Sequence, residues 1–245
     1  MVFIWVKIKF YQIYNSMLFK MWFFENENTK PNKIGKYKIV YIDSKKFRKS
    51  SLENQEFCSI AVHEDFPKSI KSNEIWIDDS LSNEEIPSFL KGVISRLKMS
   101  KTKDDAYKCS LKKEKEYRHK HQSKLIHKKL CELKDDKGKY EVFLVNGKAV
   151  RDKYKTDFSQ GGHGYVYDWI PRKEIWLEKE EYDEFPFILV HEYTEMTLMR
   201  DKKINYVNAH DKASNVEMKF RKDKHPIKQL TKIPEIVMSY LKINH

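Results

Sequence analysis

The chain has 245 residues, of which 40% are hydrophobic and 13% aromatic, so it can bury a sizeable core and is not disordered as a whole. Its formal net charge of +12 suits an anionic partner, and it equally suits a solvated lysine-rich surface. Seven glycines and seven prolines exclude collagen-like and glycine-rich linker classes.

The three cysteines, Cys58, Cys109 and Cys131, are odd in number and lack CxxC spacing. Neither a disulfide framework nor a thiolate zinc cluster is indicated. We therefore expect an intracellular, reducing setting such as the cytoplasm.

Residues 1–34 are predicted to form an N-terminal strand or extension. Apolar residues from Val2 to Phe10 alternate with a second set that includes Lys7 and Lys9, as in a strand. These lysines interrupt the apolar run, so the segment predicts neither a membrane span nor a signal peptide. Met17 and Met21 leave a later natural start open.

An internal repeat dominates the rest of the chain. Similar stretches recur at an offset near one hundred residues: Gly35–Asp43 with Gly138–Asn146, Glu74–Ile77 with Glu174–Leu177, and Glu114 and Arg118 with Glu217 and Arg221. We therefore predict a first unit at 35–118, a basic helical linker at 119–137, a second unit at 138–221 and a C-terminal helix within 222–245.

Each unit is expected to be a small sheet followed by a helical hairpin, which gives an α+β fold used twice. In the second unit, hydrophobic periodicity predicts strands at Tyr140–Asn146, Tyr165–Ile170 and Glu174–Leu177. It predicts helices at Pro186–Met199, Asn205–Arg221 and Pro234–Lys242.

The first helix of this hairpin carries titratable side chains on an otherwise apolar face. His191 and Glu195 lie one turn apart, and Glu192 flanks them. If the next helix runs antiparallel, His210 comes to face this pair. Two imidazoles and a carboxylate suit Zn²⁺ or another divalent metal, and Glu192 would be placed to take a proton from water at that metal.

The run His191-Glu192-Tyr193-Thr194-Glu195, preceded by a strand, resembles the active helix of zincin metallopeptidases. The resemblance covers about residues 160 to 221 and implies a zinc-dependent hydrolase acting on a peptide or protein, with Glu192 as general base. Glu195 departs from the family pattern, which has a second histidine there. With His210 as third ligand, a set of two histidines and one glutamate remains.

Other residues have supporting roles or purely structural alternatives. Glu217 is predicted to orient an imidazole or to pair with a cation, and Tyr206 to pack or to meet substrate. His163 is a spare ligand in the run Gly161-Gly162-His163-Gly164, where glycines allow close approach of a ligand or of another element. Alternatively, His191, Glu192 and Glu195 serve as ion-pair partners of arginines such as Arg200 and Arg221.

The first unit offers an internal control. Opposite the three predicted ligands it has Lys91 or Gly92, Ser95 or Arg96, and one of Tyr107, Ser110 and Leu111. None of these is a usual metal ligand, so the fold itself does not demand the histidines and the glutamate. We therefore expect the first unit to be a degenerate, structural copy.

The alternative function is a non-enzymatic protein that binds nucleic acid. Basic residues cluster on the predicted helical faces and the linker, and such faces bind phosphates with little sequence preference. The candidate contacts are Lys112, Lys113, Arg118, Lys120, Lys128 and Lys129. The sequence leaves the substrate and the oligomeric state open.

Overall fold

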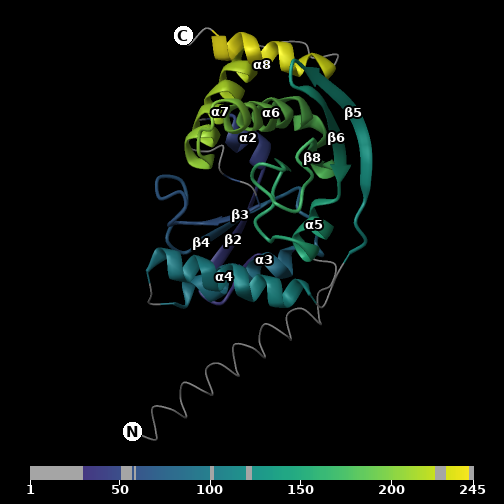
Figure 1. Ribbon diagram of the computed structural model, residues 1–245. Helices are drawn as coiled ribbons and strands as arrows, with labels where there is room; N and C mark the ends of the chain where they lie inside the picture. The colour runs from purple at the N-terminus through teal and green to yellow at the C-terminus, as the bar shows by residue number, and fades with distance from the viewer. Residues whose placement is uncertain are drawn as a thin grey trace, which may run out of the picture.

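The computed structural model describes residues 30–50, 57, 59–99, 102–119, 123–223 and 230–242. Two units of the same architecture follow one another, each a four-stranded sheet with a helical hairpin (Figure 1). This confirms the predicted α+β fold of two tandem copies. The first unit comprises β1 (Lys33–Ile34), β2 (Tyr37–Ile42), α2 (Ser44–Arg48), β3 (Ile60–Val62), β4 (Glu74–Asp78), α3 (Ile86–Leu97) and α4 (Lys103–Arg118).

The second unit repeats this order and adds a C-terminal helix. It comprises β5 (His127–Asp135), β6 (Gly138–Val145), α5 (Gly147–Lys153), β7 (Gly161–His163), β8 (Glu174–Glu178), the 3-10 turn η2 (Lys179–Glu184), α6 (Phe185–Asp201), α7 (Tyr206–Lys222), the 3-10 turn η3 (Leu230–Lys232) and α8 (Ile233–Lys242). None of the helices in the described part of the chain has the length and hydropathy of a membrane-spanning segment.

The two sheets have identical topology, which shows that the repeat extends to three dimensions. The strand orders are β1-β2-β4-β3 and β5-β6-β8-β7, with a parallel central pair and antiparallel outer pairs. Lys38 pairs with Glu74 in the first sheet, and Glu141 pairs with Glu174 in the second. The register thus matches residue by residue, and it allows each position of one unit to be compared with its counterpart.

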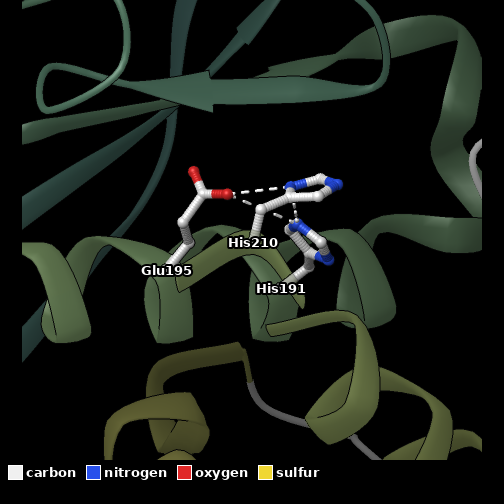
Figure 2. Close-up of side chains that lie close together, drawn as sticks. All are labelled: His191, Glu195 and His210. Carbon is white, nitrogen blue, oxygen red and sulfur yellow. Dashed lines mark hydrogen bonds and ion pairs between the residues drawn. The ribbon is translucent and has the colours of Figure 1, made fainter. Parts of the chain in front are cut away.

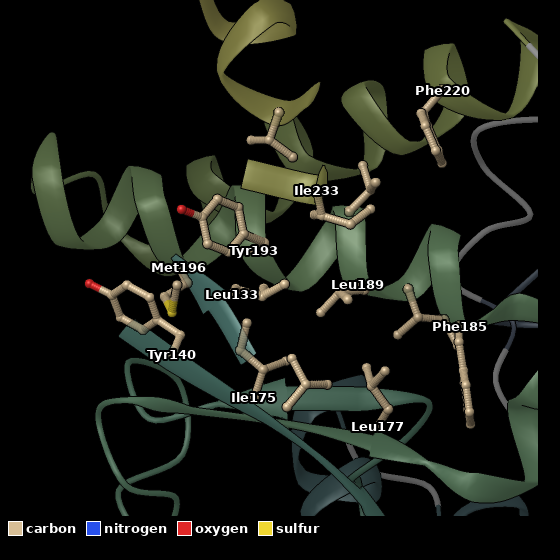
Figure 3. Close-up of a cluster of buried hydrophobic side chains, with 14 of the residues drawn as sticks. Leu133, Tyr140, Ile175, Leu177, Phe185, Leu189, Tyr193, Met196, Phe220 and Ile233 are labelled. Carbon is tan, nitrogen blue, oxygen red and sulfur yellow. The ribbon is translucent and has the colours of Figure 1, made fainter. Parts of the chain in front are cut away.

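The main core of the second unit lies between its sheet and helix α6 (Figure 3). Strand alternation turns Val142, Ile175 and Leu177 toward the helix, where they pack among Leu189, Tyr193 and other α6 side chains. Helix α8 packs across α6 and β5 and contributes Ile233 and Val237 to the same core. Because α6 is fixed on the sheet in this way, the polar side chains that it carries are held rigidly.

The hairpin of each unit begins and turns at equivalent residues. A proline lies in the first turn of both α3 and α6, where its missing N–H leaves no bond unmade. Thr102 caps α4 and Asn205 caps α7, each accepting a hydrogen bond from the backbone N–H three residues later. The caps set an offset of 103 residues between α4 and α7, and the prolines at 87 and 186 set an offset of 99 between α3 and α6.

Buried ion pairs join the two units. Arg151 on α5 donates two hydrogen bonds of 2.9 Å to the carboxylate of Glu85, which precedes α3, and also pairs with Glu178 of its own unit. Arg118 on α4 pairs with Glu85 at 3.2 Å and with Asp152 at 3.1 Å. Removing one partner from such a network leaves an uncompensated buried charge, at a cost of about 3–5 kcal/mol.

Two sequence predictions about local structure are wrong. The second strand of unit two lies at Gly161–His163 and not at Tyr165–Ile170, where the chain turns and Ile170 N–H bonds to Tyr167 C=O. Aromatic residues in that turn pack against the back of the sheet, which explains their strand-like pattern. The segment predicted as a helical linker instead contains strand β5, because it pairs with β6 as a hairpin around residues 135–138.

The other strands and helices predicted in the second unit lie within two residues of the observed ends, and the closing helix is α8. The sheets begin earlier than the predicted units, at Lys33 in the first and at His127 in the second. The strand predicted between Val2 and Phe10 lies outside the described residues.

Candidate metal centre

Helices α6 and α7 bring the three predicted ligands together (Figure 2). His191 and Glu195 project from α6 one turn apart, and His210 projects from the second turn of α7. The Lys203 backbone has a φ of 53°, and it lies in the short turn that reverses the chain between the two helices. Because this turn is short, α7 lies directly against α6, and His210 faces the pair.

The donor atoms of these residues converge on one point. Nε2 of His191 lies 3.1 Å from Nδ1 of His210, and Oε2 of Glu195 lies 2.9 Å from His210 Nδ1 and 3.9 Å from His191 Nε2. Ligands placed tetrahedrally at about 2.0 to 2.2 Å from zinc are about 3.3 to 3.6 Å apart. The observed separations bracket this range, so these residues could hold a divalent cation.

Glu217 orients His191 from the far side of the ring. Its Oε2 lies 3.1 Å from His191 Nδ1, and its Oε1 accepts a 2.9 Å hydrogen bond from Arg221, one turn further along α7. A carboxylate behind one ring nitrogen fixes the imidazole and turns the other nitrogen toward the ligand point. Glu217 thus contacts both an imidazole and a cation, the two alternatives that the sequence predicted for it.

Glu195 is enclosed by imidazoles. Its Oε1 lies 3.0 Å from Nε2 of His163, while its Oε2 faces His191 and His210. Burial raises the pKa of Glu195, but the hydrogen bonds from the three histidines outweigh burial and hold this pKa well below its usual value. Burial lowers the pKa of His191, but its hydrogen bonds to Glu195 and Glu217 raise it well above its usual value. The surroundings of these two side chains thus favour positive charge.

Glu192 lies beside the centre without joining the three convergent donors. It is within 4.8 Å of both His163 and Glu195 through its carboxylate. Burial, followed by repulsion from Glu195, raises the pKa of Glu192 to about 7. A carboxyl with this pKa can take up and release a proton near neutral pH.

Exposure is graded across the site. The side chain of Glu195 is 3% exposed, that of His191 12% and that of His210 27%, so the centre meets solvent on the α7 side. Tyr206, one turn before His210, is 46% exposed, and its ring centroid lies 5.5 Å from the His210 ring. Tyr206 therefore stands at the outer margin of the site and not within the core.

The first unit has the equivalent helices and glutamate–arginine pair but lacks the three donor side chains. The offsets set by the prolines and the caps place Gly92 opposite His191, Arg96 opposite Glu195 and Tyr107 opposite His210. The Glu217–Arg221 pair has its counterpart in Glu114 and Arg118, which also bond one turn apart at 2.8 Å. A Cβ built on Gly92 would lie 3.2 Å from Glu114 Oε2, so even the direction from His191 to Glu217 is repeated.

The ion pairs predicted as an alternative, from His191, Glu192 or Glu195 to Arg200 or Arg221, are not found among the described residues. Arg221 bonds to Glu217 and Glu184, and Arg200, at the C-terminal end of α6, bonds to Asp135, Tyr140 and Asp201. The ion pairs of Glu195 in the described chain all join it to histidines. The glutamate at the centre is therefore not neutralised by an arginine or lysine of the described chain.

The candidate nucleic-acid contacts lie on two different elements, and one of them is buried. Arg118 is fully buried in ion pairs, so its prediction as a phosphate contact is wrong. Lys112 and Lys113 lie on α4, whereas Lys128 and Lys129 lie on strand β5, and Lys113 and Lys129 are paired with Glu116 and Glu141. Lys120 lies outside the described residues.

His163, predicted as a spare ligand, is instead fully buried and in hydrogen-bond contact with Glu195. The signal lay in the glycine run: a Cβ on Gly161 would lie 3.1 Å from Glu192 Cγ, and one on Gly162 would clash with the Tyr167 ring. The glycines thus admit other elements of the protein, and β7 comes close to α6.

Comparison with family models finds no match to the chain, and neither curated proteins nor solved structures give one.

Proposed function

We propose that this protein is a metal-dependent hydrolase, with a zinc site of the zincin type that cleaves peptide bonds. The supporting observation is the convergence of His191 Nε2, His210 Nδ1 and Glu195 Oε2 from two rigid helices at separations suited to a tetrahedral cation. His191, Glu195 and His210 would hold the ion. When bound, zinc supplies Lewis acidity toward a carbonyl oxygen and toward water.

Charge supports a cation at this point. Glu195 and Glu217 are both buried and both held in the ionised form, and within the described ranges the one arginine that pairs with either of them, Arg221, contacts Glu217. A buried carboxylate needs a compensating positive charge. In the metal-free protein a proton on His191 provides it, and a divalent ion at the same place would provide more.

The acid–base role falls to Glu192. Its carboxylate lies next to the ligand set, and its pKa of about 7 lets it accept a proton from an attacking water and pass it to a leaving amine. Glu192 projects from the same helix as two of the ligands, so its position relative to them is fixed by α6. This is the division of roles that the resemblance to zincins implies.

The degenerate first unit argues against a purely structural reading. The first unit has the same fold with Gly92, Arg96 and Tyr107 in place of the three donors. Packing alone therefore does not call for two histidines and a buried glutamate at these positions.

A cleavage assay tests the proposal. The zinc-loaded chain is incubated with an unfolded protein substrate, and fragments are followed by mass spectrometry. We expect cleavage that stops with a chelator and returns when zinc is added back. The matched control is His210→Tyr, which installs the residue that the first unit carries, and which should fold but not cleave. Cleavage by His210→Tyr at the wild-type rate would refute the assignment.

A further inference from the structure

His163 lies between strand β7 and the ligand Glu195, and its surroundings fix which of its nitrogens carries a proton. The residue is fully buried, and its Nε2 lies 3.0 Å from Glu195 Oε1. On the other side of the ring, the backbone N–H of Tyr165 donates a 3.2 Å hydrogen bond to Nδ1. Both ring nitrogens are therefore engaged.

The two contacts are compatible with one neutral tautomer. A nitrogen that accepts a hydrogen bond has a free lone pair and no proton, so Nδ1 is unprotonated. The proton must then be on Nε2, which donates it to Oε1 of Glu195. A nitrogen that carries a proton has no lone pair for a metal, so His163 is not a ligand in this arrangement.

We propose that His163 is a positioning residue that makes Glu195 a monodentate metal ligand, bound through one oxygen. Its donated proton occupies Oε1 and leaves Oε2 alone to face His191 and His210. The donor atoms of His163, Glu192 and Glu195 also lie within 4.8 Å of one another. The same proton prevents this neighbouring group from binding a second cation. The centre is therefore mononuclear, an inference that rests on the proposed metal site.

Strand β7 is adapted to this role. Its register with β8 shows that Gly161, Gly162 and His163 are equivalent to Ile60, Ala61 and Val62 of the first unit. Gly161 lets the strand approach α6 closely, since a Cβ there would lie 3.0 Å from Ile188 Cγ2 and 3.1 Å from Glu192 Cγ. The first unit, which lacks the three donors, has the buried apolar Val62 where the second has His163.

The test compares wild type with two variants of His163. His163→Val installs the first unit's own residue, and His163→Gln keeps a hydrogen-bond donor near the position of Nε2. Zinc affinity and stoichiometry are measured by competition with a chelating dye, and the visible spectrum is recorded with Co²⁺ in place of zinc. Thermal melting of the metal-free proteins checks folding.

We expect one ion per chain in wild type. His163→Val should bind zinc about 10 to 100 times more weakly, the usual effect of losing a residue that orients a ligand. Its Co²⁺ bands should weaken, since freed Oε1 raises the coordination number. His163→Gln should retain most of the affinity and the wild-type spectrum. A purely structural role would change melting without this spectral difference.

The wild-type protein gives a second measurement that needs no variant. Nitrogen NMR of the histidine side chains should show His163 as the Nε2–H tautomer both with and without zinc. A switch to Nδ1–H on zinc addition, two ions per chain, or unchanged affinity and spectrum in His163→Val would each overturn the proposal. No zinc binding by wild type would overturn the proposed function itself, and this inference with it.

Discussion

His191 Nδ1 lies 3.1 Å from Glu217 Oε2, and this contact joins the candidate centre to the frame of the fold. Arg221 holds the other oxygen of Glu217 and also pairs with Glu184 at the start of α6. The first unit repeats the glutamate–arginine pair as Glu114 and Arg118 without any histidine to orient. The pair therefore occurs in both units, whereas the first unit has Gly92 at the position of His191.

Replacing Glu217 should weaken metal binding. Glu217→Gln removes the charged acceptor behind His191, and we expect zinc affinity to fall about 10- to 100-fold. Isothermal titration with zinc measures the change. The matched control is Glu114→Gln, which alters the equivalent pair in the first unit and should leave zinc affinity unchanged. Equal losses in both variants would mean that the effect is general destabilisation.

Replacing Glu192 should separate catalysis from metal binding. Glu192→Gln keeps the shape of the side chain but cannot accept a proton, so hydrolysis should fall about 10²- to 10⁴-fold at unchanged zinc affinity. In wild type the rate should decline as the pH falls, with a midpoint at or below 7, because a nearby cation lowers the carboxyl pKa from its metal-free value of about 7. Full activity in Glu192→Gln would exclude its role as base.

The metal-free protein should lose stability as pH rises. The pKa of His191 is raised well above its usual 6.5 in the fold, so its contribution is complete below pH 6.5 and is lost as pH rises through the folded value. The pKa of Glu195 is lowered from 4.5, so its contribution is complete above pH 4.5 and is lost on acidification. His191 and Glu195 together therefore stabilise the metal-free protein most between about pH 4.5 and 6.5.

Urea unfolding of the metal-free protein, kept in a chelator, at a series of pH values measures this dependence. The decline above pH 6.5 should be smaller in His191→Ala, which lacks the titrating ring. Zinc should reverse the decline, because metal replaces the proton and binds more tightly as pH rises. A wild-type profile identical to that of His191→Ala would contradict the predicted linkage.

Arg118 should matter for stability and not for nucleic acid. Its side chain is fully buried and pairs with Glu85, Glu114 and Asp152. Arg118→Ala should lower the free energy of unfolding by about 3–5 kcal/mol, because three carboxylates lose their common partner. Lys112→Ala, an exposed change on the same helix, should have almost no effect on unfolding. Similar stability of the two variants would contradict the buried network.

Local periodicity and self-similarity were enough to predict the repeat and the convergence of His191, Glu195 and His210. The spacing of His191 and Glu195 fixes their relation on any helix, and the short turn after Asp201 brings α7 against α6. Chain order alone then favours a meeting with His210. These features are local, so the sequence carries them.

The features that were missed depend on contacts distant in sequence. Strand β5 exists because it pairs with β6, and its lysine-rich sequence carries little strand signal. The aromatic run after His163 resembles a strand, although it packs as a turn on the back of the sheet. The burial of Arg118 depends on Glu85 and Asp152, and the bond from His163 to Glu195 depends on how closely β7 approaches α6. Pattern analysis of one segment reveals none of these.

Metal content measured on the purified chain is the most direct test of the central claim. After loading with zinc and removal of free ion, mass spectrometry under native conditions should find one zinc ion bound to each wild-type chain and none to His191→Ala or His210→Tyr, both correctly folded. A wild-type chain that retains no zinc, or variants that retain as much as wild type, would contradict the account.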